Sequence, residues 1–521
     1  MSAAARQCGD ASLALQRRQL LAGLAGTAAA LALPAMPALA LPARAADFDA
    51  AFAAQPLLRP YKGLSDSTAQ LDAQARICGR WPADLRGRFH RNGPALFERG
   101  GERYHHWFDG DGMVQQFSIA DGQVRHRGRL VQTRKLLAER AAGRFLFSAF
   151  GTTVPGTPPV SGPDAFNTAN TSVIEHAGRL LAMWEGGSAW ALDPEDLSTI
   201  GPVTWRADLA QMPFSAHPKV DPQGHLWNVG AFGRTLVVWR IGPQGALLRV
   251  QLGESPFAGG MVHDMAVTGK YIVVPLPPVR LDFGKASIGP RSFALVPGEP
   301  LRVLVMDKND IAQRRVFELP PELVFHVGNA HDTPSGEVVL SYIGAPDAGF
   351  LSQGAVALMQ ARHVDVAPAS TCIATLDMRS GLVRQQRIDR AGEGCEFPRV
   401  DPRRTGLPTR WLLTAAAWRP GPDGERLSQF HGVQLSDTQT GRSQRFDHGP
   451  HALAEEHVLV PKPGKTGELD AWVLGTHFDA RRQVTLLNVL DAAHLEDGPL
   501  AQAELPYALP PGFHGNFTAA A

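Results

Sequence analysis

The chain has almost no net charge and few cysteines. It carries 51 lysines and arginines against 50 aspartates and glutamates, a formal net charge of +1. This balance argues against binding to nucleic acid or to an anionic membrane surface. The four cysteines form no CxxC pair, which excludes a zinc ribbon or a thioredoxin-type site. Because Cys8 lies in a segment that we expect to be removed, three cysteines would remain, and we expect no full disulfide framework.

Several cofactor motifs are also missing. No GxGxxG follows a predicted strand and no GxxxxGK[ST] loop occurs, which argues against a dinucleotide enzyme and a P-loop enzyme. No HEXXH pair places two metal ligands on one helix. After the N-terminal region, no stretch is long and apolar enough to cross a bilayer. Short-range motifs therefore identify no cofactor.

The N-terminus has the layout of a secretory signal. Paired arginines at 17–18 precede an uncharged run from Gln19 to Ala43. Small residues in the A-x-A pattern occur at 38–40 and at 43–45. The paired arginines indicate the twin-arginine route. The alternative is an N-terminal membrane anchor, since the run is long enough to span, but its alanine, glycine and proline content makes it weakly apolar.

We therefore predict a signal peptide over residues 1–45 and one exported domain over residues 46–521. No linker rich in proline, serine or charge divides the chain after residue 46. The expected location is the periplasm. Because twin-arginine export carries folded proteins, this route would suit an enzyme that is loaded with its metal in the cytoplasm.

The rest of the chain is typical of an all-β protein. Its 53 glycines and 41 prolines indicate many turns, and the segments between them are rich in valine, leucine, isoleucine and tryptophan. Strands are predicted at 179–186, 225–232, 235–241, 270–276, 302–308, 337–343, 410–418 and 484–490. The best helix candidates are 133–147 and 347–364. So many short strands need an architecture that hides their edges, and a β-propeller does so while its central channel offers a site.

Four of the 18 histidines stand out by their surroundings. His217, His263 and His326 each precede a turn and a strand, and His514 lies near the C-terminus. Such wide spacing places them on different parts of the fold, and a radial architecture can bring distant residues together on its axis. Taken singly, each also fits a buried histidine bonded to a carbonyl group, so the spacing alone does not establish a site.

Several motifs, in order, resemble those of the carotenoid cleavage oxygenase family. The segment RNGPALFERGGERYHHWFDGDGMVQQFSI at 91–119 is similar to the family pattern of RNGP followed by HWFDGDGM. Further similar segments are FNTANTSVIEHAGRLLAMWEGG, FSAHPKVDP, MVHDMAVT, CEFPRVDPR and FHGNF. The resemblance covers about residues 55 to 521. It implies a seven-bladed β-propeller with a few helices and loops capping the iron-binding face. It also implies an Fe(II)-dependent dioxygenase with one Fe(2+) per chain.

The resemblance also implies roles for individual residues. Those matching the family's four iron ligands are His217, His263, His326 and His514. Those matching the glutamates that accept hydrogen bonds from the ligand rings are Glu185, Glu396 and Glu456. Thr171 matches the residue that often lies beside the open iron position. Two positions have rivals: Glu455 adjoins Glu456, and His331 lies near His326, because this chain reads FHVGNAHD where members often read FHHVNAYE.

This set of residues suits oxygen chemistry. Imidazole is a ligand for iron, zinc and copper, and four neutral histidines leave the full 2+ charge on the metal. Glutamates that bind the other ring nitrogens would compensate this charge and fix each tautomer. Four ligands on an octahedral ion would leave two positions, one for O₂ and one that the methyl group of Thr171 would crowd. Cleavage of an alkene into two carbonyls uses all four electrons that O₂ can accept, so no reduced cosubstrate is needed.

The FDGDGM segment, which lies within these motifs, could contain catalytic carboxylates. Asp109 and Asp111 could form a carboxylate pair, but a tight turn in which each bonds its own backbone is the favoured interpretation. His105 and His106 could mimic metal ligands. We interpret both as structural, because the residues that match the family's ligands lie elsewhere.

The resemblance implies an apolar alkene as the substrate, and we favour an apocarotenoid-like polyene. Cleavage of a stilbene is the alternative: Lys135 lies where stilbene-cleaving relatives carry a phenol-binding lysine, although it also fits a solvated helix charge. Residues 347–361 fit either the mouth of a substrate tunnel, with peripheral membrane contact, or a packed amphipathic helix. An isomerase on the same scaffold and a propeller that only binds a ligand are further alternatives. The oligomeric state stays open.

Overall fold

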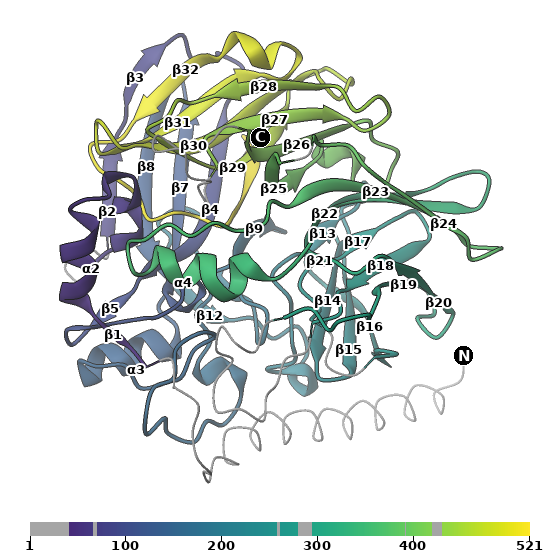
Figure 1. The fold of residues 1–521 in the computed structure, drawn as a ribbon, viewed down its shortest axis with the longest axis horizontal. Coiled ribbons are helices and arrows are strands. Elements are labelled where there is room, and N and C mark those ends of the chain that lie inside the picture. The colour runs from purple at the N-terminus through teal and green to yellow at the C-terminus, as the bar shows by residue number, and fades with distance from the viewer. Residues whose placement is uncertain are drawn as a thin grey trace.

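The computed structural model describes residues 41–65, 70–257, 261–279, 294–390, 392–418 and 430–520. Within these residues the strands form seven sheets of four or five strands, together with one small sheet (Figure 1). The small sheet consists of β1 (Ala43–Arg44), β6 (Glu102–Arg103) and β5 (Glu98–Arg99). Residues 1–40 of the predicted signal peptide lie outside the described residues.

The seven large sheets follow one another along the chain as blades. The first, in spatial order, contains β2 (Gln70–Gln74), β8 (Gln123–Leu130), β7 (Asp111–Ala120), β4 (Gly87–Leu96) and β33 (His514–Ala519). The second contains β12 (Thr199–Pro202), β11 (Trp190–Leu192), β10 (Arg179–Met183) and β9 (Ser172–His176). The third contains β13 (Lys219–Val220), β14 (Leu226–Phe232), β15 (Thr235–Ile241) and β16 (Leu247–Glu254).

The remaining four blades complete the ring. The fourth contains β17 (Ala266–Val267), β18 (Tyr271–Leu276), β19 (Leu301–Asp307) and β20 (Arg314–Leu319). The fifth contains β21 (Leu323–Asp332), β22 (Glu337–Ala345), β23 (Ser370–Asp377) and β24 (Val383–Arg387). The sixth contains β25 (Gly394–Arg399), β26 (Trp411–Ala417), β27 (Gly432–Asp437) and β28 (Ser443–Asp447). The seventh contains β29 (Ala452–Pro461), β30 (Ala471–Asp479), β31 (Val484–Asp491), β32 (Pro499–Glu504) and β3 (Arg76–Gly79).

This arrangement is the predicted seven-bladed β-propeller. Every strand expected from the sequence is present, with ends shifted by a few residues at most. The ring closes twice with strands from opposite ends of the chain: β3 pairs with β32, and β33 pairs with β4. In Figure 1 the yellow C-terminal strands accordingly lie beside the purple and blue N-terminal ones. Both closures tie residues near His514 into the ring.

Apolar contacts between neighbouring blades form the core. Val303 of β19 and Leu340 of β22 are fully buried and belong to one cluster that joins the fourth and fifth blades. Central strands such as β15 therefore have buried residues on both faces. This burial explains why their sequences are nearly continuous apolar runs and do not alternate with polar residues. The sheets consequently pack face to face around the axis.

The described residues contain few helices, and these helices are short. α3 (Arg134–Ala142) begins at the Thr133 cap and ends at Gly143, whose φ of 64° stops it before the predicted end at 147. Within 347–364, the π-helical turn η7 (Phe350–Gly354) runs into the short α4 (Ala355–Leu358). α4 shares an apolar cluster with α2 (Ala45–Phe52) and with the 3₁₀ segment η1 (Pro56–Lys62). Among the described residues, no helix is long and apolar enough to cross a membrane.

Candidate metal centre

One polar residue lies in, or up to three residues before, the innermost strand of each blade, and together these residues border the cavities at the propeller axis. These strands contact one another around the channel. In chain order the groups are Thr171 before β9, His217 before β13, His263 before β17, His326 in β21, Glu396 in β25, Glu456 in β29 and His514 at the start of β33. The site predicted from the sequence therefore draws on all seven blades.

Three of these strands contain a β-bulge next to the residue that faces the axis. The pairing shifts around His326 in β21, between Glu396 and Arg399 in β25, and around Glu456 in β29. Each shift inserts one extra residue, which redirects side chains that would otherwise alternate between the two faces. In β25 the bulge includes Phe397, whose φ of 57° is left-handed. The bulge lets Glu396 and Arg399 both point toward the axis.

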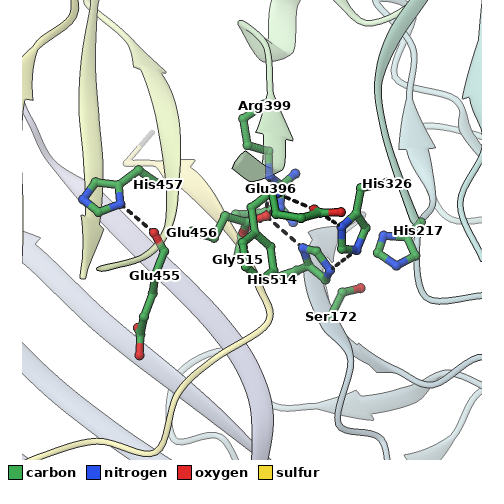
Figure 2. Close-up of polar contacts among 12 residues, drawn as sticks. Ser172, His217, His326, Glu396, Arg399, Glu455, Glu456, His457, His514 and Gly515 are labelled. Carbon is green, nitrogen blue, oxygen red and sulfur yellow. Dashed lines mark hydrogen bonds and ion pairs between the residues drawn. The ribbon is translucent and has the colours of Figure 1, made fainter. Parts of the chain in front are cut away.

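The four histidines converge on one point through their Nε2 atoms. The distance between Nε2 atoms is 3.0 Å from His217 to His263, 3.3 Å from His263 to His326 and 3.1 Å from His326 to His514. The rings of His217 and His514 lie 4.6 Å apart between centroids. All four side chains are buried. We call them the histidine cluster, and Figure 2 shows three of its members.

A glutamate lies against the opposite nitrogen of three rings. The Nδ1 of His326 is 2.5 Å from Glu396, and the Nδ1 of His514 is 2.8 Å from Glu456. The carboxylate of Glu185 lies against the Nδ1 of His263. A carboxylate accepts hydrogen bonds, so each of these rings carries its proton on Nδ1 and directs a lone pair from Nε2 into the cluster.

The structure decides between the rival residues. Glu456 faces His514, whereas Glu455 turns away and pairs with Arg91 (Figure 2). His331 is half-buried on β21 and does not join the cluster that includes His326. The residues chosen from the sequence are therefore the ones that meet.

The surroundings affect the pKa values of the histidines differently. Burial and the neighbouring imidazoles hold the pKa of His217 well below its usual value. Burial lowers the pKa of His514 to about 4, despite the nearby carboxylate. For His326, burial also acts to lower the pKa, but Glu396 outweighs it and the net pKa is raised. Burial opposes ionisation of Glu456, but Arg399 and His514 lower its pKa to about 2.

This donor set fits a divalent metal that accepts nitrogen ligands. Lone pairs on Nε2 atoms about 3 Å apart repel one another unless a cation lies among them. Imidazole suits iron, copper, zinc and nickel, and the glutamates supply compensating negative charge behind the rings. The residues that could hold the ion are His217, His263, His326 and His514.

Two cavities meet at the histidine cluster. The larger, about 670 Å³, is bordered by His263, His326 and His514. Its wall includes the aromatic residues Phe108, Phe150, Phe325, Phe350, Phe430 and Phe513. The smaller, about 250 Å³, is bordered by His217, His326 and His514 and contains the ion pairs Lys219–Asp264 and Arg399–Glu456. We call them the apolar cavity and the polar cavity.

Two residues border the cluster from the apolar side. Thr171 lines the apolar cavity with Glu185 and donates its hydroxyl to Asn170 at 3.1 Å. The ring of Phe325 stacks on that of His263, with 3.7 Å between centroids and 22° between planes. A stacked phenyl ring prevents the imidazole from tilting, so Phe325 helps to fix the direction of its lone pair.

Residues 347–361, the candidate tunnel mouth, divide between two environments. Phe350 and Leu351 line the apolar cavity. Leu358 and Met359 instead pack in the cluster beneath α2 and η1. The segment is therefore cavity wall at its start and packed helix at its end.

Lys135 is neither a solvated helix charge nor a lining residue of the apolar cavity. Its side chain is 1% exposed, and its ammonium contacts Tyr104 at 2.7 Å, Asp111 at 2.8 Å and Glu139 at 3.0 Å. All three donor hydrogens of the ammonium therefore have acceptors. This buried charge network corrects the interpretation of Lys135 as a solvated helix charge and does not support a role in phenol binding.

The FDGDGM segment is structural, but not through the expected self-bonded turn. Asp109 accepts hydrogen bonds from Gly151 at 2.8 Å and Thr152 at 2.6 Å, which anchors a distant loop. Asp111 binds Lys135 instead of its own backbone. His106 is likewise structural, since its Nε2 lies 2.9 Å from the carbonyl oxygen of Leu351. The segment thus supports the wall of the apolar cavity.

Sequence reasoning missed Arg399 and Phe325. Both adjoin predicted residues: Phe325 precedes His326, and Arg399 lies in the same CEFPRVDPR segment as Glu396. The sequence gives no sign that Arg399 reaches a glutamate of another blade. Only the bulge in β25 turns it that way.

Comparisons with known proteins agree with this geometry. The family model described as retinal pigment epithelial membrane protein matches residues 65–519. Apocarotenoid-15,15'-oxygenase of Synechocystis is 29% identical over 467 residues, covering 84% of this chain and 91% of the relative. Lignostilbene-α,β-dioxygenase isozyme III of Sphingomonas paucimobilis is 30% identical over 493 residues, covering 88% and 96%. The solved structure of cobalt-substituted Synechocystis apocarotenoid oxygenase has a TM-score of 0.78 at 27% identity, covering 89% and 99%.

Proposed function

This chain belongs to the carotenoid cleavage oxygenase family, and on that premise we propose that it cleaves one double bond of an apocarotenoid-like polyene with O₂. The observation that carries the proposal is the position of the four Nε2 atoms, which converge at the end of a large apolar cavity. Ferrous iron is the proposed ion, one per chain, held by His217, His263, His326 and His514. The proposed reaction balances without a further reductant: one alkene and one O₂ give two carbonyl compounds.

The residues of the chain prepare this reaction by holding protons and excluding water. Glu185, Glu396 and Glu456 keep the Nδ1 protons of three rings, so that the Nε2 lone pairs stay available. When bound, ferrous iron supplies the redox chemistry that lets O₂ react with an alkene. The aromatic wall keeps water from the reacting carbons and aligns an extended apolar chain. Thr171 limits the space beside the histidine cluster.

The lining of the apolar cavity favours a polyene over a stilbene. A phenolic substrate needs polar groups placed to bind its hydroxyl. Lys135 is not available for this role, because its ammonium is fully bonded within a buried network. No lysine lines the apolar cavity among the residues that the structure describes. The cavity volume of about 670 Å³ is within the usual range for small-molecule sites.

Stilbene cleavage is the second candidate, favoured by the 30% identity to the lignostilbene dioxygenase. The two are separated by loading the purified protein with Fe(II) under anaerobic conditions and then supplying O₂ with an apocarotenal or a hydroxystilbene. We expect two aldehydes from the apocarotenal, at a kcat/KM at least about tenfold above that for the stilbene. Aldehydes from the stilbene alone would reassign the substrate. One rearranged product of unchanged mass would indicate an isomerase.

We further propose that the chain is exported to the periplasm by a twin-arginine signal. The sequence prediction ends the signal at residue 45; we propose the earlier of the two A-x-A positions instead, with cleavage after Ala40. Ala43 and Arg44 pair with β6, and α2 begins at Ala45, so a later cut would remove packed residues. The mature protein from the periplasm should begin at Leu41 by mass spectrometry. An intact N-terminus on that protein would contradict the signal.

A further inference from the structure

The three glutamates behind the histidine cluster are anchored to very different degrees. The side chain of Glu185 is 34% exposed and has one recorded partner among the described residues, His263. Glu396 also accepts a hydrogen bond from the backbone N–H of Phe397 at 2.6 Å. Glu456 is buried and has three further bonds besides that to His514. The difference comes from Arg399.

The guanidinium of Arg399 donates hydrogen bonds to both carboxylate oxygens of Glu456, a bidentate arrangement that we call the fork. Its Nε donates to Oε1 at 2.8 Å, and its Nη2 donates to Oε2 at 2.9 Å. The same Nη2 donates to the carbonyl oxygen of Gly515 at 2.8 Å. The backbone N–H of Gly515 in turn donates to Glu456 at 2.6 Å. Figure 2 shows Arg399 and Glu456 beside His514.

These bonds connect three blades at the point where the propeller closes. Arg399 comes from β25, Glu456 from β29, and His514 and Gly515 from β33, the C-terminal strand. β33 is attached to its own blade by pairing with β4. His514 is its first residue, at an end where strands usually fray. The side chain of Glu456 needs a fixed position if it is to hold His514 there.

We propose that Arg399 is a positioning residue that acts through Glu456 to hold His514 in the metal-binding geometry. The fork fixes the plane of the carboxylate, and its bond to Gly515 fixes the backbone next to the ligand. Without it, Glu456 keeps only its bonds to His514 and to the backbone N–H of Gly515, and the plane of its carboxylate is no longer fixed by the fork. His514 is then the donor that the metal loses first. This inference rests on the proposed metal centre but not on the identity of the substrate.

The test measures metal binding directly, with Co(II) as the probe. Protein stripped by a chelator is titrated with Co(II) against a competing chelating dye, and the visible absorption of the bound ion is recorded. Arg399→Leu should raise the Kd about tenfold, the range seen when partners of metal ligands are removed. Its Co(II) spectrum should also differ from that of the wild type. Unchanged Kd and spectrum would overturn the inference.

Arg403→Leu is the matched control. Arg403 forms a similar fork with Asp401 and also donates to the carbonyl oxygens of Lys465 and Gly467, away from the histidine cluster. We expect its Kd to stay within about twofold of wild type. A general structural role would lower the melting temperature of both apo variants alike and leave both Kd values unchanged, which would also overturn the inference.

A double variant tests whether Arg399 acts through Glu456. Glu456→Gln combined with Arg399→Leu should raise the Kd by less than the product of the two single effects, because the fork to the carboxylate is already lost in Glu456→Gln and only the bond to Gly515 remains. Independent, multiplicative losses would contradict this route. If Arg399→Leu does not fold, Arg399→Lys retains the charge without the fork and should still bind more weakly than wild type. Wild-type protein that binds neither Co(II) nor Fe(II) would overturn the proposed function as well.

Discussion

The apolar and polar cavities share two histidines and differ in nearly everything else. His326 and His514 border both, whereas His263 borders only the apolar cavity and His217 only the polar one. The wall of the first is largely apolar, with many aromatic rings, and the second contains the ion pairs Lys219–Asp264 and Arg399–Glu456. Salt bridges of this kind hold side chains in fixed positions. An apolar wall instead favours the binding of an apolar ligand.

The contrast assigns a task to each side of the histidine cluster. The polar side holds the ligands from behind, through charges that are already paired. The apolar side leaves room for an alkene within a largely apolar wall. Glu185 and Glu396 are exceptions, since both reach a ligand ring from the apolar cavity, and Glu185 has the least support of the three glutamates. The following substitutions test this division, beginning with the one that should have the largest effect.

Loss of one nitrogen donor should have the largest effect, because the metal would lose one of its four ligands. His263→Ala removes a ligand that only the apolar cavity contacts, and the metal content should fall from near one to below about a tenth per chain. Elemental analysis measures this, with circular dichroism to confirm the fold. His331→Ala is the matched control, since His331 lies on β21 outside the histidine cluster and should leave the metal in place. Unchanged metal in His263→Ala would remove this residue from the ligand set.

Filling each cavity in turn separates substrate binding from metal binding. Ala345→Trp places an indole in the apolar cavity and should lower kcat/KM for an apocarotenal roughly 10- to 100-fold at unchanged metal content. Val220→Phe adds bulk to the polar cavity and should change it less than about threefold. Steady-state kinetics with iron quantification checks both. Equal losses from the two variants would mean that the substrate uses both cavities.

Glu185 and Glu456 can be compared because Glu185 has few bonds that hold it in place and Glu456 has several. Glu185→Gln should leave most of the metal bound and lower turnover about tenfold, because a neutral amide compensates the metal charge less well. Glu456→Gln should also lower the melting temperature, because the guanidinium of Arg399 loses its carboxylate. Metal analysis, kinetics and calorimetry are needed together. Wild-type turnover in Glu185→Gln would remove it from the site.

Lys135 belongs to neither cavity, so its substitution should have the smallest effect on the metal centre. Lys135→Met breaks a buried charge network and should cost about 3–5 kcal/mol of stability, measured by chemical denaturation. The ratio of kcat/KM for the polyene to that for the stilbene should stay unchanged. A selective loss of stilbene cleavage would instead place Lys135 in contact with the phenol.

The sequence predicted most of the fold and the membership of the site. Apolar segments ending at glycine, proline or asparagine are strands in the structure, because burial between blades and the need to turn at each blade edge leave that pattern. The four histidines, the three glutamates and Thr171, which the family motifs singled out, lie together in the structure. The helices were overestimated at both candidates, since Gly143 stops one and the other begins as a π-helical turn.

Partners from distant segments could not be read from the chain. Lys135 looks like any helix lysine, and only the packing of α3 places it against Tyr104 and Asp111. The same holds for Arg399, which reaches Glu456 because a bulge interrupts the alternation of β25. Neither a bulge nor a contact between blades has a signature in local composition.

The sequence alone thus determined which strands form and which residue types could hold a metal, because local burial, turn chemistry and ligand chemistry act within short segments. The tertiary structure decided which of those residues meet. Seven blades bring their innermost strands to one axis, and there Glu456 is selected over the adjacent Glu455, and His326 over His331. Convergence of this kind depends on the closure of the whole ring, which no single segment encodes.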